Sequence, residues 1–357
     1  MPLRRKRARL QEWVESAENR RSCGFSFKGV SAVTVQEIFD LVKADLREVE
    51  REFGRQVASP VEAISSIGSY LQESGGKRLR PALLLLCARL CGSNGSSASI
   101  KLGTVVEFLH TATLVHDDII DGSDLRRGRA SANMKWGNQK CVLAGDWLYM
   151  QSYVLALSEK NFRILEILTE VTQKMVEGEM IQLHWQGRSD IDEPSYLDIA
   201  TRKTALLFSA CGRLGAVLGK RTAEEESKIG EYGRNLGMAF QLIDDLLDFT
   251  SDEKTLGKPV LSDLKEGKVT LPLIYALQRC SSEEAAKVRR VLRDSGFRRV
   301  KSIEILDLVE KYRVLPSTRA RAKEYADRAR EQLAGFSDSR YKQALLDIAE
   351  FVIARDK

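Results

Sequence analysis

Residues 116–121 read His-Asp-Asp-Ile-Ile-Asp, and residues 241–248 read Gln-Leu-Ile-Asp-Asp-Leu-Leu-Asp. Each stretch has the form D-D-x-x-D and ends an apolar segment. On a helix, positions four apart share a face, so the first and last aspartates of each cluster project together. Like charges at this spacing destabilise an isolated helix, and two such clusters therefore predict bound cations that neutralise them. An all-oxygen ligand set favours Mg²⁺, which is usually shared with substrate phosphates.

The segments around these clusters show helical periodicity and no long period-two alternation. Helices are therefore predicted at about 61–73, 101–121, 138–158, 161–185, 195–220 and 224–249, with others from about 34 and within 270–357. The 357 residues are 43% hydrophobic and 30% charged, an ordinary composition for a globular protein. The pattern predicts an all-α fold in a single domain over residues 31–357.

Residues 1–30 are predicted to form a basic, disordered extension. Residues 4–9 hold five cations, but Glu12, Glu15 and Glu18 follow, and a transit peptide would be poor in acids. Weak attraction to an anionic membrane surface is the alternative interpretation. The net charge of +6 is modest and no aromatic residues interleave with a basic stripe, so a nucleic-acid partner is not indicated.

The six cysteines are scattered and form no C-x-x-C pair. Without a signal peptide before them, they predict reduced thiols and a cytoplasmic location. Cys87 and Cys91 lie one helical turn apart, but no second ligand pair accompanies them, so small core residues are expected rather than a zinc site. The apolar runs are too short to span a bilayer.

Residues 74–81, Ser-Gly-Gly-Lys-Arg-Leu-Arg-Pro, combine a glycine turn, clustered cations and a proline that opens an apolar helix. Such a segment predicts an anion site rather than a solvated basic loop. A second basic loop, Gly122 to Arg129, contains three arginines directly after the first acidic cluster. A third, from Leu256 to Lys268, follows the second cluster. Together these loops predict sites for diphosphate groups.

Within the first acidic helix, His110, Thr113, Asp117 and Asp121 fall on one polar stripe. A polar stripe on so apolar a helix should face a cavity, although His110 by itself could equally be a buried core histidine. His116 points elsewhere and His184 has no partner at ligand spacing, so both are interpreted as structural.

On the second acidic helix, Gln241, Asp245 and Asp248 share a stripe with Asp244 at its edge. Two acidic triads, at least two basic clusters and an apolar helical shell suit a diphosphate bound through Mg²⁺ and a second diphosphate bound without metal. A metal-bound diphosphate is a good leaving group, and its departure from an allylic carbon leaves a carbocation. Because the chain has no Walker-type loop, phosphoryl transfer is not indicated.

The motifs Gly75-Gly76-Lys77-Arg78-Leu79-Arg80-Pro81, Asp117 to Asp121 with Arg126-Arg127, Lys203-Thr204, and Gln241 to Asp248 with Lys258 resemble those of the trans-isoprenyl diphosphate synthases. The resemblance runs from about residue 35 to the C-terminus, with the motifs in the family's order. It implies a bundle of ten or more helices around a central cavity, and usually a homodimer.

The resemblance also implies roles for individual residues. About three Mg²⁺ ions and the allylic diphosphate would be bound by Asp117, Asp118, Asp121, Asp244, Asp245 and Asp248. Isopentenyl diphosphate would be bound by Lys77, Arg80, His110 and Arg127. Arg126 would contact the allylic diphosphate, farnesyl or geranylgeranyl, and Lys258 would add to the diphosphate contacts. Lys203, Thr204 and Gln241 would line the site where the cation forms. The isopentenyl double bond would attack this cation in a 1'-4 condensation, and a proton would then be lost.

In the trans-isoprenyl diphosphate synthases, which this sequence resembles, aromatic residues four and five positions before the first aspartate motif shorten the product. Thr113 and Ala112 occupy these positions here and are small. A long product of about C40 to C50, the size of quinone side chains, is therefore expected, and Ala112→Phe should shorten it.

The alternatives are a shorter-chain geranylgeranyl-type synthase, or a subunit of a heteromeric synthase that would normally lack one acidic cluster. A terpene cyclase would not need the anion site at residues 74–81. A carboxylate-bridged di-iron bundle needs two Glu-x-x-His motifs. The sequence from Glu107 to His110 is one such motif, but we find no second, so this class of protein is rejected.

Overall fold

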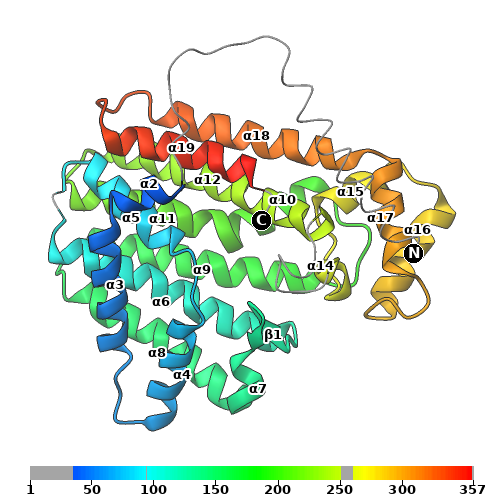
Figure 1. Ribbon diagram of the computed structural model, residues 1–357, viewed down its shortest axis with the longest axis horizontal. Helices are drawn as coiled ribbons and strands as arrows, with labels where there is room; N and C mark the ends of the chain where they lie inside the picture. Colours follow the sequence, from blue (N-terminus) through cyan, green and yellow to red (C-terminus); the bar gives the residue numbers. More distant parts are fainter. Residues whose placement is uncertain (1–34, 94, 251–259, 356–357) are drawn as a thin grey trace. The chain divides into compact units, whose positions relative to one another are not determined.

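The computed structural model describes residues 35–93, 95–250 and 260–355. These residues fold almost entirely into helices (Figure 1), which confirms the predicted all-α class. In chain order the helices are α2 (Val35–Asp40), α3 (Lys43–Gln56), α4 (Glu62–Glu73), α5 (Leu79–Leu90), α6 (Ser97–Ile120), α7 (Ala132–Trp136), α8 (Asn138–Leu157), α9 (Phe162–Trp185), α10 (Glu193–Ala200), the π-helix η2 (Thr201–Ala205), α11 (Leu206–Leu218), α12 (Ala223–Thr250), α14 (Ser262–Lys265), α15 (Leu271–Leu277), α16 (Ser282–Arg293), α17 (Ser302–Lys311), α18 (Val314–Gln332) and α19 (Arg340–Ala354). A two-residue antiparallel hairpin, β1 (Leu125–Arg126) and β2 (Arg129–Ala130), forms within the arginine loop.

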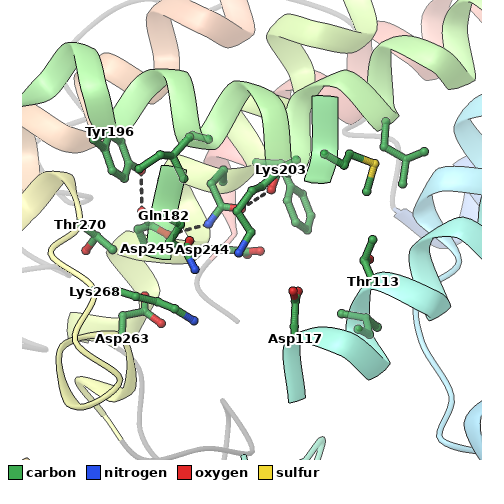
Figure 2. Close-up of a pocket in the computed structure, with 18 of the residues that line it drawn as sticks. Thr113, Asp117, Gln182, Tyr196, Lys203, Asp244, Asp245, Asp263, Lys268 and Thr270 are labelled. Carbon is green, nitrogen blue, oxygen red and sulfur yellow. Dashed lines mark hydrogen bonds between the residues drawn. The ribbon is translucent and has the colours of Figure 1, made fainter. Parts of the chain in front are cut away.

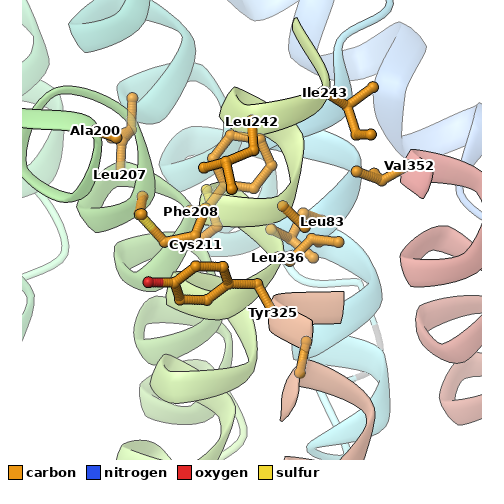
Figure 3. Close-up of a cluster of buried hydrophobic side chains, with 14 of the residues drawn as sticks. Leu83, Ala200, Leu207, Phe208, Cys211, Leu236, Leu242, Ile243, Tyr325 and Val352 are labelled. Carbon is orange, nitrogen blue, oxygen red and sulfur yellow. The ribbon is translucent and has the colours of Figure 1, made fainter. Parts of the chain in front are cut away.

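Helix α5 lies in the interior of the described bundle. Its residues from Pro81 to Ala88 are all buried, because the sequence is apolar on every face and such a helix belongs in an interior. It packs against α6 and α11, and α11 packs along α12. Figure 3 shows where Leu83 of α5, Phe208 of α11 and Leu236 of α12 meet. Each fully buried leucine of this kind stabilises the fold by roughly 1.5–3 kcal/mol.

Small residues of α11 allow its neighbours to approach closely. A Cβ atom at Gly212 would lie 2.3 Å from the backbone oxygen of Ile229 in α12. At Gly215 it would lie 2.7 Å from the Cβ atom of Cys87 in α5. Any larger side chain at these two positions would force the helices apart.

The segment from 195 to 220 is not the single helix that its sequence predicts. The structure divides it into α10, the π-helix η2 and α11. A π-turn inserts one extra residue and rotates the side chains that follow, and such turns are frequent at functional sites. Lys203 and Thr204 lie in this turn.

Both acidic clusters lie at the carboxyl ends of long helices, α6 and α12. Helix α6 begins four residues earlier than predicted, because the Ser96 hydroxyl accepts a hydrogen bond from the Ser99 N–H and caps the first turn. The carboxyl end of a helix carries partial negative charge, so carboxylates there are unfavourable without a nearby cation. This position adds to the like-charge repulsion within each cluster.

None of the helices in the described ranges is both long and apolar enough to cross a membrane. The described cysteines are free thiols, as predicted, at Cys87, Cys91, Cys141, Cys211 and Cys280. The predicted N-terminal extension and Cys23 lie outside the described residues, and so does Lys258. The assignment of residues 1–30 to a separate extension therefore stays a prediction.

Candidate active site

The two acidic helix ends lie on the walls of one cavity of 410 Å³ (Figure 2). Asp117 comes from α6, whereas Asp244 and Asp245 come from α12. Two lysines, Lys203 from η2 and Lys268 from the segment after α14, line the same cavity. Tertiary folding therefore brings together carboxylates that are 127 positions apart in the chain.

In the first cluster, Asp117 and Asp121 lie beside cations. The pKa of Asp117 is raised to about 6, mainly by burial and also by the neighbouring Glu179 and Asp121, while Lys203 opposes this rise. The Asp121 carboxylate accepts a hydrogen bond from Lys268 Nζ at 2.6 Å. Burial alone would lower the pKa of Lys268, but its acidic neighbours raise it above its ordinary value, so the lysine stays charged.

Asp118, between these two aspartates, is buried and pairs with an arginine. Both of its oxygens lie 2.8 Å from Arg126 Nε, and Arg126 Nη2 lies 2.6 Å from Oδ1. This paired geometry is the strong form of an arginine–carboxylate contact. Asp118 therefore holds the arginine loop against α6.

In the second cluster, Asp244 is paired with the last residue described at the C-terminus. Arg355 Nη1 lies 3.0 Å from Asp244 Oδ1. The Arg355 guanidinium also stacks 4.6 Å from the ring centre of Phe240. The end of α19 thus places a cation beside the cavity.

Asp245 is buried, with 3% of its surface exposed, and both of its oxygens accept hydrogen bonds. The Tyr196 hydroxyl donates to Oδ2, and Gln241 Nε2 donates to Oδ1 at 2.7 Å. Burial and the nearby Asp263 raise the pKa of Asp245 to about 8, while these two hydrogen bonds favour the charged form.

Asp248 turns toward the short helix α14. It accepts hydrogen bonds from the Ser262 N–H at 3.2 Å and hydroxyl at 2.9 Å, and from the Asp263 N–H at 3.3 Å. The carboxylate therefore organises the end of the loop that follows α12.

The six predicted ligands accordingly divide into two groups. Asp118, Asp245 and Asp248 bind donors of the protein scaffold. Asp117, Asp121 and Asp244 lie next to lysine or arginine; Asp117 and Asp244 line the cavity, and Asp121 binds Lys268, which lines it too. In the described residues, no three histidine, cysteine, aspartate or glutamate side chains lie close enough to hold a metal ion together. The chemistry of the second group still fits Mg²⁺, because these carboxylates supply only oxygen atoms and already attract cations.

Part of the predicted anion site lines the same cavity. Arg80 Nη1 is 3.0 Å from His110 Nε2, and its guanidinium lies 4.9 Å from the ring centre of Phe208. Its buried Nε has no hydrogen-bond partner in the described structure. Arg127 also lines this cavity. An arginine with an unused buried N–H suits a bound oxyanion.

His110 is neutral in this arrangement. Burial and the surrounding arginines, Arg80 first, lower the pKa of His110 well below its ordinary value. The neutral imidazole therefore accepts the hydrogen bond from Arg80 through Nε2, and the proton lies on Nδ1.

Arg78 and Lys77 occupy different surroundings. Arg78 has a left-handed backbone conformation (φ 47°) and pairs with the buried carboxylate of Glu107. A smaller pocket of 30 Å³, beyond His110, is lined by Arg78, Arg126 and Arg127. Burial and Arg355 lower the pKa of Lys77, whose side chain is not part of either pocket wall.

The π-turn η2 is held by α9. Lys203 Nζ forms an ion pair with Glu179. A Cβ atom at Gly178 would lie 2.6 Å from the Cβ atom of Arg202 and 3.2 Å from the backbone N of Lys203. The absence of a side chain at Gly178 therefore lets η2 approach α9. The Thr204 hydroxyl donates to Gln241 Oε1 at 2.7 Å.

The two predicted chain-length positions differ in location. Thr113 lines the cavity. Ala112 is fully buried in an adjoining apolar cluster with Phe53, Phe108 and Leu148. The role of both positions in product length stays a prediction.

Four residues at the site were not assigned a role from the sequence: Tyr196, Glu179, Lys268 and Arg355. Lys268 had a recognisable signal, because it follows Gly267 in the third basic loop. The other three carry no local signal, since each is defined by a partner that is distant in the chain.

Comparisons with known proteins agree with this geometry. The model of the polyprenyl synthetase family matches residues 61–308. The chain is 38% identical to the octaprenyl diphosphate synthase of Haemophilus influenzae, covering 91% of this chain and 98% of that protein. It is 37% identical to an all-trans-nonaprenyl-diphosphate synthase (geranyl-diphosphate specific) of Rhodobacter capsulatus, covering 90% and 98%.

A solved structure supports the same assignment. The polyprenyl synthase from Caulobacter crescentus CB15, complexed with calcium and isoprenyl diphosphate, superposes with a TM-score of 0.86 and 36% identity. The match covers 92% of this chain and 100% of that one. The chain therefore belongs to the polyprenyl synthetase family and is a prenyltransferase.

Proposed function

We propose that the protein is a long-chain all-trans-polyprenyl diphosphate synthase. It condenses isopentenyl diphosphate successively onto an allylic diphosphate and forms a product of about C40 to C50, a precursor of quinone side chains. The observation that carries the proposal is a single cavity with carboxylates from two helix ends and the Arg80–His110–Arg127 site on its walls. The octaprenyl and nonaprenyl synthases among the relatives support the long product.

Mg²⁺ would be held chiefly by Asp117, Asp121 and Asp244, with about three ions in each site. When bound, the metal supplies positive charge that stabilises the departing diphosphate. Lys268 and Arg355 lie beside two of these carboxylates and compensate part of their charge. Asp118, Asp245 and Asp248 would act through the scaffold that they hold, rather than as direct ligands.

The two substrates would occupy different walls. Arg80, Arg127 and Lys77 would bind the diphosphate of isopentenyl diphosphate, with neutral His110 orienting Arg80. Lys203, Lys268 and the predicted Lys258 would bind the allylic diphosphate, with Arg126 close behind Asp118.

Other residues of the cavity would stabilise the positive charge on the reacting carbon. Thr204 and Gln241 present uncharged polar atoms to the place where positive charge develops. Oxygen dipoles oriented before the reaction stabilise such a charge without further reorganisation. The apolar walls keep water from the cation, and the departing diphosphate accepts the proton that is finally lost.

We also propose a homodimer. Helix α8 exposes Leu143, Met150, Val154 and Leu157 at helical spacing, and α9 exposes Phe162, Val176, Met180 and Leu183. Contiguous exposed apolar surface marks an interaction site, and a two-fold dimer would cover the same face on both copies. Sedimentation of the full chain should give twice the monomer mass, and Met150→Glu with Met180→Glu should reduce it to one chain. Weak membrane association and a cytoplasmic location remain predictions.

The proposed reaction is tested with the purified full chain, Mg²⁺, farnesyl diphosphate and labelled isopentenyl diphosphate, followed by sizing of the products. Label should appear in products of about C40 to C50. Asp117→Ala and Asp244→Ala should each lose most turnover, whereas replacement of Asp327, a partly exposed aspartate of α18, by alanine should leave it unchanged. No incorporation by the wild-type chain would refute a self-sufficient synthase, and products ending at C20 would favour the geranylgeranyl-type alternative.

A further inference from the structure

Tyr196 belongs to none of the motifs, yet it lines the cavity (Figure 2). Helix α10 presents it there, and Asp192 caps this helix by accepting a hydrogen bond from the Ser195 N–H. The tyrosine is buried, with 6% of its surface exposed. A buried phenol needs a partner for its hydroxyl, and the one it has is Asp245, 49 positions further along the chain.

The hydroxyl starts a continuous series of hydrogen bonds. Tyr196 donates to Asp245 Oδ2, and Gln241 Nε2 donates to Asp245 Oδ1. Gln241 Oε1 then accepts from the Thr204 hydroxyl. The series joins three separate elements, α10, α12 and η2. It ends at Thr204, which the proposed function places beside the reacting carbon.

The chemistry of the groups gives this series one direction. The Tyr196 hydroxyl and the Gln241 NH₂ both donate to Asp245, so the Gln241 amide oxygen is turned toward the Thr204 hydroxyl, from which it accepts. Asp245 is buried, so each of its oxygens needs a donor. Without the phenol hydroxyl, Oδ2 would lack its donor, and the carboxylate would be free to rotate toward Gln241 or toward a cation in the cavity.

We propose that Tyr196 is a positioning residue for prenyl transfer: by holding Asp245, it orients the Gln241 amide and the Thr204 hydroxyl toward the carbon that ionises. This inference rests on the proposed synthase function. It assigns Tyr196 no contact with substrate. Its effect should therefore appear in the chemical step and not in the binding of isopentenyl diphosphate, whose predicted ligands take no part in this series of hydrogen bonds.

Tyr196→Phe removes only the hydroxyl. We expect kcat to fall about tenfold to a hundredfold, the range that one buried acceptor left without its donor represents. KM for isopentenyl diphosphate should stay within about twofold of wild type. The matched control is Tyr232→Phe, which removes the hydroxyl of another fully buried tyrosine, bonded to the Leu345 carbonyl far from the cavity. The control should keep its kcat even if its Tm falls.

A double-mutant cycle separates orientation of Gln241 from general loosening of the site. In a Gln241→Ala background, Tyr196→Phe should change kcat by less than about twofold, because the group that it orients is gone. Equal effects of Tyr196→Phe and Tyr232→Phe on kcat, a rise confined to KM, or additive effects in the cycle would each overturn the inference. A wild-type chain that incorporates no isopentenyl diphosphate would overturn the proposed function and this inference together, whereas an active wild type with an unaffected Tyr196→Phe would overturn this inference alone.

Discussion

Replacing Asp117 with asparagine should stabilise the metal-free protein although it should remove most turnover. The carboxyl group of Asp117 has a pKa of about 6 in the folded protein, against an ordinary value of 3.8. Burial is the main cause, followed by the effects of neighbouring charges. Asparagine keeps the shape of the side chain and loses the charge that folding must bury.

The direction and size of the effect follow from the raised pKa. Between pH 3.8 and about 6 the unfolded chain loses the Asp117 proton while the folded protein keeps it, so folding stability decreases as pH rises through this window. Above pH 6 the full penalty is on the order of 3 kcal/mol. This is an upper bound, because Asp117 borders the cavity and water screens it. For a chain of 357 residues, the corresponding gain in Tm is about 2 to 4 °C.

The assay is thermal unfolding in chelator at pH 4 and pH 7.5, together with turnover in Mg²⁺. Asp117→Asn should have a higher Tm than wild type at pH 7.5 and the same Tm at pH 4. The neighbouring Asp118→Ala is the control with the opposite sign, since it leaves Arg126 without its carboxylate and should destabilise by about 3 kcal/mol. If Asp117→Asn lowers Tm at pH 7.5, or raises it equally at pH 4, the idea that the first cluster is electrostatically strained without metal is wrong.

Three further outcomes are expected. Thr113→Phe should shorten the product, as measured by chromatography, because Thr113 lines the cavity; an unchanged length would refute its role there. Gly178→Ala should lower turnover at least ~10-fold and stability by about 1–3 kcal/mol, since a Cβ atom would displace the turn that carries Lys203; full activity would show that this close approach is dispensable. Glu107→Gln should lower stability by about 3 kcal/mol in urea unfolding and raise KM for isopentenyl diphosphate, because the charge that holds Arg78 is lost; an unchanged KM would separate this ion pair from the anion site.

Local patterns in the sequence were sufficient to predict the fold class and the chemistry. Residues three and four apart in a helix share a face, so the periodicity of the apolar residues predicted most helices to within a few positions. The two D-D-x-x-D clusters and the Gly-Gly-Lys-Arg-Leu-Arg-Pro segment likewise carry their charge within a few residues. Their interpretation as parts of one site for two diphosphates needed no distant contact.

The π-turn at η2 was not predictable in this way. Residues 195–220 have the composition of one helix, and the extra residue in the turn depends on how α9 and α12 pack around it. The close approach at Gly178 and the ion pair of Lys203 with Glu179 become visible only when α9 lies beside η2.

The different contacts of the six aspartates were also decided by tertiary structure. The helical stripe placed Asp245 and Asp248 together and Asp244 at its edge, whereas in the fold Asp244 lies beside Arg355 and Asp248 binds the start of α14. Asp245 is held by Tyr196, from a different helix. The identity and spacing of the carboxylates are local properties and can be read from the chain, but the role of each depends on which donor or cation lies beside it. Those partners come from distant segments that only folding brings together.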